Sequence, residues 1–291
     1  MSFNWREQDD ETVEYHFNPR LSVPDILELL QVHSDRSASV IELIGGNLDL
    51  RYGNRPKQTL DIHATRNESL GSPAPCLIFI HGGYWRMSDK KDVAFIAEPL
   101  TEDGVTVASI NYDLCPDVNL DIIVEEIREA VVFLCKNAEK FSIDANRLFI
   151  SGHSAGGHLT GMMLKQNWES YGLPSELFKG GIPLSPIFEP EVVMRTSINE
   201  DVRLTLDMAR RNDVLSAPPL TSGQILSVAG ALEPEGWRQQ SLLYTDLCTK
   251  SGIKANYLEI PDCHHFSVLD CLLYTSDAAD EGLGVDLGGR G

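Results

Sequence analysis

The apolar residues of this chain fall into short continuous runs, separated by stretches in which apolar positions recur every three or four residues. The runs at 75–81, 105–112 and 148–150 are typical of strands buried on both faces of a parallel sheet. The clearest helical stretch is 120–141, where apolar side chains form one stripe and charged side chains mostly lie opposite. Strands that alternate with helices predict an α/β fold, with a mostly parallel sheet and helices on both of its faces.

Weaker patterns complete this outline. Alternation of apolar and polar residues predicts strands at 48–52 and 59–64, joined by a turn-like Gly-Asn-Arg-Pro. Shorter runs predict strands at 181–185, 224–229 and 255–260, and helices at 24–30, from 159 onward, at 201–210 and at 237–250.

No internal repeat and no linker interrupts this alternation, so we expect a single domain over residues 1–273. Residues 1–40 are charged and mixed, and we expect an N-terminal arm that packs on the domain. Residues 186–222 form a long and less regular stretch, which makes them a candidate lid. Residues 274–291 are rich in glycine and aspartate and lack helical spacing, so we expect a disordered or non-native tail.

Charge and composition narrow the choice of partners. The formal net charge of −19 over 291 residues argues against nucleic acid and against an anionic membrane surface. The six cysteines are scattered without a C-x-x-C pair, so we expect a reducing, cytoplasmic setting and no disulfide framework. The first residues do not resemble a secretory signal, and no apolar run approaches the length of a membrane span. A small-molecule substrate is the expected partner, and a homodimer is left open.

The most specific motif is Gly152-His-Ser-Ala-Gly156, a G-x-S-x-G between the apolar run 148–150 and the helical pattern that follows. A serine on so sharp a strand-to-helix turn has an exposed hydroxyl, and the flanking glycines let neighbouring backbone pass closely. The helix start also aims free N–H groups at an anion formed beside the serine. The alternative is a glycine-rich turn that only joins a strand to a helix. The flanking strand and helix favour Ser154 as a nucleophile.

A serine nucleophile needs a histidine base and a carboxylate that orients the base. With this kind of turn, the acid and then the histidine follow the serine along the chain. His264 and His265 come directly after the last predicted strand, and Glu233 and Glu235 come after the strand before it. Each pair therefore holds a candidate.

The oxyanion of an acyl-transfer reaction needs at least two backbone donors. One is the N–H of Ala155, and the other is expected in the loop His81-Gly-Gly-Tyr-Trp85. Gly82 and Gly83 would let bare backbone reach the substrate oxygen, although a diglycine turn that merely closes a strand is the alternative. Tyr84 and Trp85 belong either to the core or to an acyl- or aryl-binding pocket.

A metal enzyme is the weaker interpretation. Cys263 lies beside His264 and His265, but adjacent residues rarely point at one ion, and paired ligand spacing is absent elsewhere. We therefore expect no metal and no cofactor.

Three segments, His81-Gly-Gly-Tyr-Trp85, Gly152-His-Ser-Ala-Gly-Gly-His158 and His265-Phe266, together resemble the kynurenine formamidase (arylformamidase) branch of the α/β-hydrolases. The resemblance runs from about residue 14 to residue 270 and is supported by Asn111-Tyr112, by 197–199 and by Gln240-Ser241. It implies the α/β-hydrolase fold.

The same resemblance selects among the candidates. The interval to Gln240-Ser241 implies Glu233 as the acid, although the family often has aspartate there. The phenylalanine that directly follows His265 implies this histidine as the base, whereas esterases with an H-x-F pattern would select His264.

The activity implied by the resemblance is that of a serine hydrolase in the kynurenine pathway of tryptophan catabolism. Such an enzyme cleaves an N-formyl arylamide, such as N-formylkynurenine, to formate and an arylamine through an acyl-enzyme. The alternative is a carboxylesterase acting on short acyl esters with the same groups. A non-catalytic, ligand-binding α/β-hydrolase fold is a third hypothesis, but such proteins tend to lose a triad member and here all three are present.

Overall fold

The computed structural model describes residues 3–23, 25–67 and 72–270, and the predicted tail at 274–291 lies outside these ranges. Eight strands form one sheet in the order β1-β2-β4-β3-β5-β6-β7-β8. The strands are β1 Asn47–Arg51, β2 Thr59–His63, β3 Ala74–Ile80, β4 Thr106–Ile110, β5 Ile143–His153, β6 Phe178–Leu184, β7 Gln224–Gly230 and β8 Ala255–Ile260. β2 runs antiparallel to β1 and β4, and the other neighbours are parallel. The predicted fold class is confirmed.

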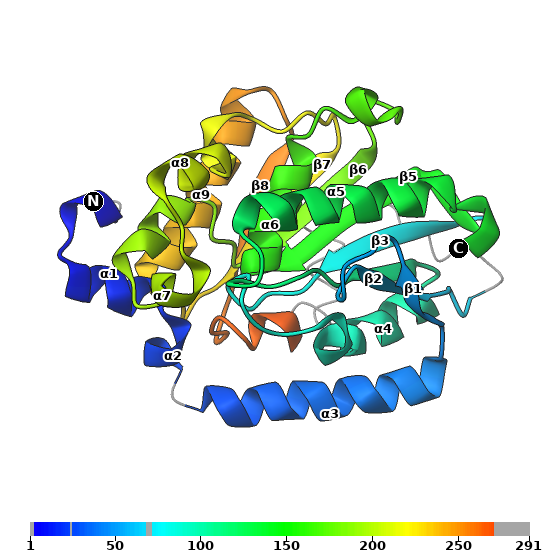
Figure 1. Cartoon of the computed structure of the whole chain (residues 1–291), viewed down its shortest axis with the longest axis horizontal. Coiled ribbons are helices and arrows are strands. Elements are labelled where there is room, and N and C mark those ends of the chain that lie inside the picture. Colours follow the sequence, from blue (N-terminus) through cyan, green and yellow to red (C-terminus); the bar gives the residue numbers. More distant parts are fainter. Residues whose placement is uncertain (1–2, 24, 68–71, 271–291) are drawn as a thin grey trace.

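Helices cover both faces of this sheet (Figure 1). They are α1 Asp10–Phe17, α2 Pro19–Ser22, α3 Ile26–Ile44, α4 Ala97–Glu102, α5 Leu120–Lys136, α6 Ala155–Leu164, α7 Asn199–Val202, α8 Leu206–Arg211 and α9 Glu235–Lys250. Short 3-10 segments lie at Trp5–Glu7, Lys90–Ile96, Glu139–Phe141, Trp168–Tyr171, Pro190–Arg195 and Val214–Ser216.

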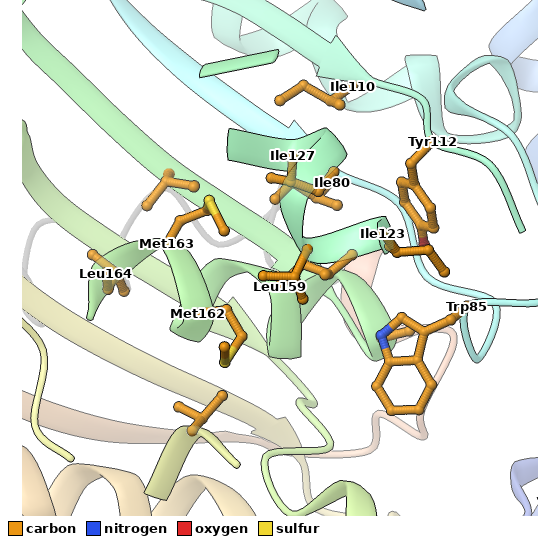
Figure 2. Close-up of a cluster of buried hydrophobic side chains, with 14 of the residues drawn as sticks. Ile80, Trp85, Ile110, Tyr112, Ile123, Ile127, Leu159, Met162, Met163 and Leu164 are labelled. Atoms are coloured by element: carbon orange, nitrogen blue, oxygen red, sulfur yellow. The ribbon is translucent and has the colours of Figure 1, made fainter. Parts of the chain in front are cut away.

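The buried side chains form two clusters because successive residues of a strand point to opposite faces. Ile78 and Ile80 of β3 belong to the larger cluster, whereas Phe79 between them belongs to the smaller one, together with Val40 of α3. Figure 2 shows part of the larger cluster, in which Leu159 of α6 lies near Ile80 and near residues of α5.

Helix α5 shows how local sequence sets an element. The side chain of Asn119 caps its first turn by accepting a hydrogen bond from the Ile122 N–H, at 3.0 Å. The apolar stripe that the sequence predicts is buried. The helix ends at Lys136, before the predicted end at 141, and a separate 3-10 turn follows at Glu139–Phe141.

The N-terminal region departs most from the prediction. In place of one helix at 24–30 it has three helices, and α3 continues to Ile44. The buried face of α3 includes two polar residues, His33 and Ser37, which conceals its helical stripe in the sequence. Both are satisfied, because His33 Nε2 lies 2.8 Å from Asp270 Oδ2 and Ser37 Oγ accepts from the Phe95 N–H.

The start of the chain is held by the segment 186–222. Arg195 donates to the carbonyl oxygens of Trp5, at 3.0 Å, and of Gln8, at 2.8 Å. Trp5 in turn donates through Nε1 to Glu189, at 3.2 Å. The segment itself folds as short helices, and its role as a lid stays a prediction.

Four cysteines, Cys76, Cys115, Cys135 and Cys248, carry free thiols, whereas Cys263 is disulfide-bonded. The sequence predicts no disulfide framework, and Cys263 departs from that expectation. In the described part of the chain, no helix has the length and apolar character needed to cross a membrane.

Candidate active site

Ser154 occupies a sharp turn between β5, which ends at His153, and α6, which begins at Ala155. Its φ of 57° and ψ of −115° lie in a region that residues other than glycine rarely adopt. The flanking glycines are required by space, because a Cβ at Gly156 would collide with the carbonyl oxygen of Ile80, and one at Gly152 with that of Gly156. The G-x-S-x-G spacing thus follows from the close approach of β3, β5 and α6.

Glu233 and His265 are joined in a buried pair, with His265 Nδ1 at 2.8 Å from Glu233 Oε2. The other carboxylate oxygen, Oε1, accepts from the Ser185 hydroxyl at 2.5 Å and from the Gly230 N–H at 2.6 Å. A carboxylate held at both oxygens fixes the proton of His265 on Nδ1 and leaves Nε2 as an acceptor.

The alternative candidates lie elsewhere. Glu235 is exposed at the first turn of α9. His264 Nδ1 accepts hydrogen bonds from the N–H groups of Phe266 and Ser267, both at 3.2 Å. The His264 ring is therefore bonded to the backbone of the turn in which it lies. Of the two candidate pairs, the structure brings Glu233 and His265 together.

Two other buried rings contact the His265 ring. The centroid of Trp237 lies 4.3 Å from that of His265, and the centroid of His153 lies 4.8 Å from it. The Nε2–H of His153 donates to the carbonyl oxygen of His265 at 2.6 Å. Burial, with the nearby His265, holds the pKa of His153 well below its ordinary value, so this ring is neutral near pH 7.

The two predicted oxyanion glycines lie beside Ser154. A Cβ at Gly82 would lie 3.2 Å from Ser154 Cβ, and Gly83 has a φ of 104° that favours glycine. Ala155 is the first residue of α6, where the N–H has no partner within the helix. Gly82 and Ala155 thus lie next to Ser154, and Gly83 lines the same cavity.

His81 supports the oxyanion loop. Its ring stacks on the ring of Tyr112, with centroids 4.3 Å apart. His81 Nε2 lies 3.1 Å from Asn111 Oδ1, and the Tyr112 hydroxyl donates to the His81 carbonyl oxygen at 2.9 Å. Burial lowers the pKa of His81 to about 4. The Asn111-Tyr112 pair therefore supports the backbone on which Gly82 lies.

A cavity of about 360 Å³ opens beside these groups. Ser154, His265, Gly82 and Gly83 line it, together with His153, Phe266, and residues of the N-terminal arm and of α3. Of the candidate lid 186–222, Ile198 contributes to this lining.

The two aromatic residues of the oxyanion loop have different positions. Tyr84 lines the cavity, and its hydroxyl donates to the carbonyl oxygen of Phe17. Trp85 is fully buried, is absent from the cavity lining, and packs its ring edge-on against His158 at 5.0 Å. Of the two readings of Trp85, the structure places it in the core rather than in a pocket.

Several residues of the site are not identified from the sequence. Ser185 ends the predicted strand 181–185, and its place at the carboxyl end of a parallel strand could have suggested a role. Arg20 and the first turns of α3 enter the cavity lining from an arm that we expected only to pack on the domain. Within the described ranges, we find no group of three or more His, Cys, Asp or Glu residues that could hold a metal ion.

Known proteins of related sequence include kynurenine formamidases. The BD-FAE family model matches residues 60–189. The chain is 28% identical to a kynurenine formamidase of Salmo salar, over 92% of this chain and 93% of that protein. It is 27% identical to one of Danio rerio, over 93% and 94%.

Solved structures show the same fold. A candidate thioesterase from Silicibacter superposes with a TM-score of 0.79 at 23% identity, covering 96% of this chain and 99% of that one. An esterase of Pyrobaculum calidifontis superposes with a TM-score of 0.67 at 17% identity, covering 99% and 94%. The chain therefore has the α/β-hydrolase fold. By sequence it is kynurenine formamidase-like, with similarity that spans most of the chain.

Proposed function

We propose that this protein is a serine hydrolase that cleaves an N-formyl arylamide such as N-formylkynurenine. The observation that carries the proposal is the buried Glu233–His265 pair, whose imidazole and Ser154 line one cavity beside Gly82 and Gly83. These are the groups that acyl transfer through a serine requires.

In the proposed reaction, His265 Nε2 takes the hydroxyl proton of Ser154 as Oγ attacks the formyl carbon. Glu233 keeps the other proton on Nδ1 and stabilises the imidazolium that forms. The N–H groups of Ala155 and Gly83, with Gly82 beside them, hold the oxyanion. The imidazolium then protonates the arylamine nitrogen, the carbon–nitrogen bond breaks, and a formyl-enzyme remains. Water attacks this ester with His265 again as the base, and formate is released.

The formamide is favoured over an ester by the relatives. Both fish proteins are kynurenine formamidases and align over nearly all of this chain. An arylamine also leaves more easily than an alkylamine, so esterase-type machinery is sufficient. A carboxylesterase acting on short acyl esters is the second candidate, because Ser154, His265 and Glu233 would serve it equally.

A substrate panel separates the two functions. We expect kcat/KM for N-formylkynurenine to exceed that for 4-nitrophenyl acetate and 4-nitrophenyl butyrate. Rapid turnover of the esters with negligible formate release would instead establish the carboxylesterase.

Ser154→Ala tests the nucleophile itself. We expect it to lower kcat by several orders of magnitude and to abolish labelling by a fluorophosphonate, because the attacking oxygen is gone. Circular dichroism should show an unchanged fold. A variant that still takes the label would exclude Ser154 as the nucleophile and leave the non-catalytic hypothesis to be tested by ligand binding.

A further inference from the structure

Two arginine side chains, Arg20 and Arg86, line the cavity that contains Ser154 and His265. Both also line a second cavity, of about 280 Å³, together with Met87 and others. The two arginines therefore lie where the two cavities adjoin.

The oxyanion loop places Arg86. Tyr84 and Trp85 both have left-handed backbones, with φ of 50° and 56°, which residues other than glycine adopt at a cost. The turn is closed by Gly83, whose carbonyl oxygen accepts from the N–H groups of Arg86, at 3.0 Å, and of Met87, at 3.1 Å. Such strain persists only where the surrounding structure imposes it, and here it turns Arg86 toward the cavity.

The N-terminal arm places Arg20 on the same side. The Tyr84 hydroxyl donates to the Phe17 carbonyl oxygen, which ties the end of α1 to the oxyanion loop. Asn18 caps the next helix, α2, by accepting from the Arg20 N–H at 3.2 Å. Arg20 Nη2 then lies 3.7 Å from Met87 Sδ, one residue beyond Arg86.

The charges of this pair are incompletely matched. Arg86 pairs through Nη1 with Asp201, but its Nε is buried and has no hydrogen-bond partner within the described chain. Arg20 has no carboxylate partner among the described residues. Asp92, which also lines the cavity, is engaged as a cap and accepts from the Asp89 N–H at 3.0 Å. One guanidinium with an unpartnered N–H and a second without a carboxylate partner, in a chain of net charge −19, mark a place for an anion.

We propose that Arg20 and Arg86 form an anion-binding subsite that selects leaving groups carrying a carboxylate. The inference rests on the proposed function. Because the formyl group is the smallest acyl group, the cavity beside Ser154 holds mainly the arylamine portion of the substrate. The guanidinium groups bind the carboxylate of that portion while its amide carbon lies at Ser154. Arg20 and Arg86 are specificity-determining residues and take no part in the bond-breaking steps.

The test compares two substrates that differ in one group, N-formylkynurenine and its α-carboxamide. Formate release is measured for the wild type, Arg20→Gln, Arg86→Gln and the double variant. We expect the wild type to prefer the acid by about 10- to 100-fold in kcat/KM, mainly through KM, and the double variant to lose this preference. Turnover of neutral formanilide measures activity without a carboxylate, and it should stay unchanged in the control variant Arg66→Gln.

Arg66→Gln is the matched control. Arg66 pairs with Glu102 near the amino end of β4, at the sheet edge opposite to Ser154, and its loss should leave the preference intact. Asp201→Asn is the control for misfolding. It removes the carboxylate that pairs with Arg86, so it should raise the preference for the acid. A damaged fold cannot produce such a gain.

An acid preference that persists in the double variant would overturn the subsite. If the wild type releases no formate from any formamide, the proposed function fails instead, and phenyl acetate is compared with 4-acetoxybenzoate. The subsite then stands if the double variant loses the preference for 4-acetoxybenzoate, and falls if that preference is unchanged.

Discussion

Glu233 illustrates how single residues make this site. The family often has aspartate at this position, and the extra methylene of glutamate is accommodated because the side chain turns back toward the end of β7. There Oε1 meets the Gly230 N–H, three residues earlier, and the Ser185 hydroxyl at the end of β6, while Oε2 reaches His265. A carboxyl group with three hydrogen-bond partners is held rigidly, and it can hold the imidazole in one orientation.

Replacing Glu233 by glutamine tests this arrangement. We expect Glu233→Gln to lower kcat about 10³- to 10⁴-fold, because an amide can stabilise the wrong tautomer of His265 and cannot stabilise the imidazolium. Steady-state rates on 4-nitrophenyl acetate and on N-formylkynurenine measure the loss. Glu235→Gln is the matched control, since this exposed residue two positions later should change kcat by less than about twofold. Comparable rates in the two variants would remove Glu233 from the mechanism.

The choice between neighbouring residues shows where sequence reasoning stops. His264 and His265 have the same place after β8, and position along the chain cannot say which ring meets the acid. The resemblance to a family selects His265, and the structure supplies the contact with Glu233. The rings that hold His265, Trp237 and His153, come from distant segments, and their approach depends on tertiary packing.

At the scale of elements, the parallel core follows from the sequence and the N-terminal arm does not. Strand β3 is a continuous apolar run, so its composition alone predicts that it is buried on both faces. Helix α3 instead packs through a face that includes His33 and Ser37, whose polar partners are 58 or more residues away. A pattern built from hydrophobicity cannot detect such a helix, and so it also misses the arm's contribution to the cavity.

The arm is held in place by Arg195, which gives an element-scale prediction. Arg195→Gln removes donors to the carbonyl oxygens of Trp5 and Gln8 and the ion pair with Asp10. We expect faster amide hydrogen exchange over residues 5–17, measured by mass spectrometry, because backbone that was pinned from outside becomes free to open.

Arg211→Gln provides the comparison for this variant. Arg211 lies in the same segment 186–222 and forms an exposed ion pair with Asp121, which is of a kind that contributes little to stability. Amide hydrogen exchange over residues 5–17 in Arg211→Gln should match that of the wild type. If Arg195→Gln and Arg211→Gln exchange at the same rate there, the apolar contacts of Phe17 and its neighbours hold the arm without Arg195.

At the scale of the whole molecule, buried titratable groups tie stability to pH. Burial lowers the pKa of His81 and of His158 to about 4, and both rings support the loops around Ser154. Glu126 of α5 is affected in the opposite direction, because burial raises its pKa to about 7. Its Oε2 accepts from the Asp113 N–H at 2.8 Å, and Arg55 Nε lies 3.5 Å from Oε1.

These shifts predict two opposing pH effects on the free energy of unfolding. The unfolded chain protonates a histidine below about pH 6.5, whereas folded His81 and His158 resist protonation down to about 4. Their contribution is therefore present above pH 6.5 and is lost as the pH falls toward 4, by about 3 kcal/mol for each ring. Glu126 contributes stability below its ordinary pKa of 4.5, and this contribution is lost as the pH rises through 7.

Denaturant unfolding of the wild type and Glu126→Gln at pH 4.5, 6 and 8 separates these effects. The two histidines outweigh the single carboxyl, so we expect the wild type to lose stability between pH 6.5 and 4.5. Glutamine keeps an acceptor for the Asp113 N–H and carries no charge, so Glu126→Gln should be more stable than the wild type at pH 8 and should lose this advantage near pH 4.5. The variant should consequently show the steeper decline on acidification, since the opposing term has been removed. Parallel stability curves for the two proteins would mean that Arg55 neutralises Glu126 and that burial does not govern its titration.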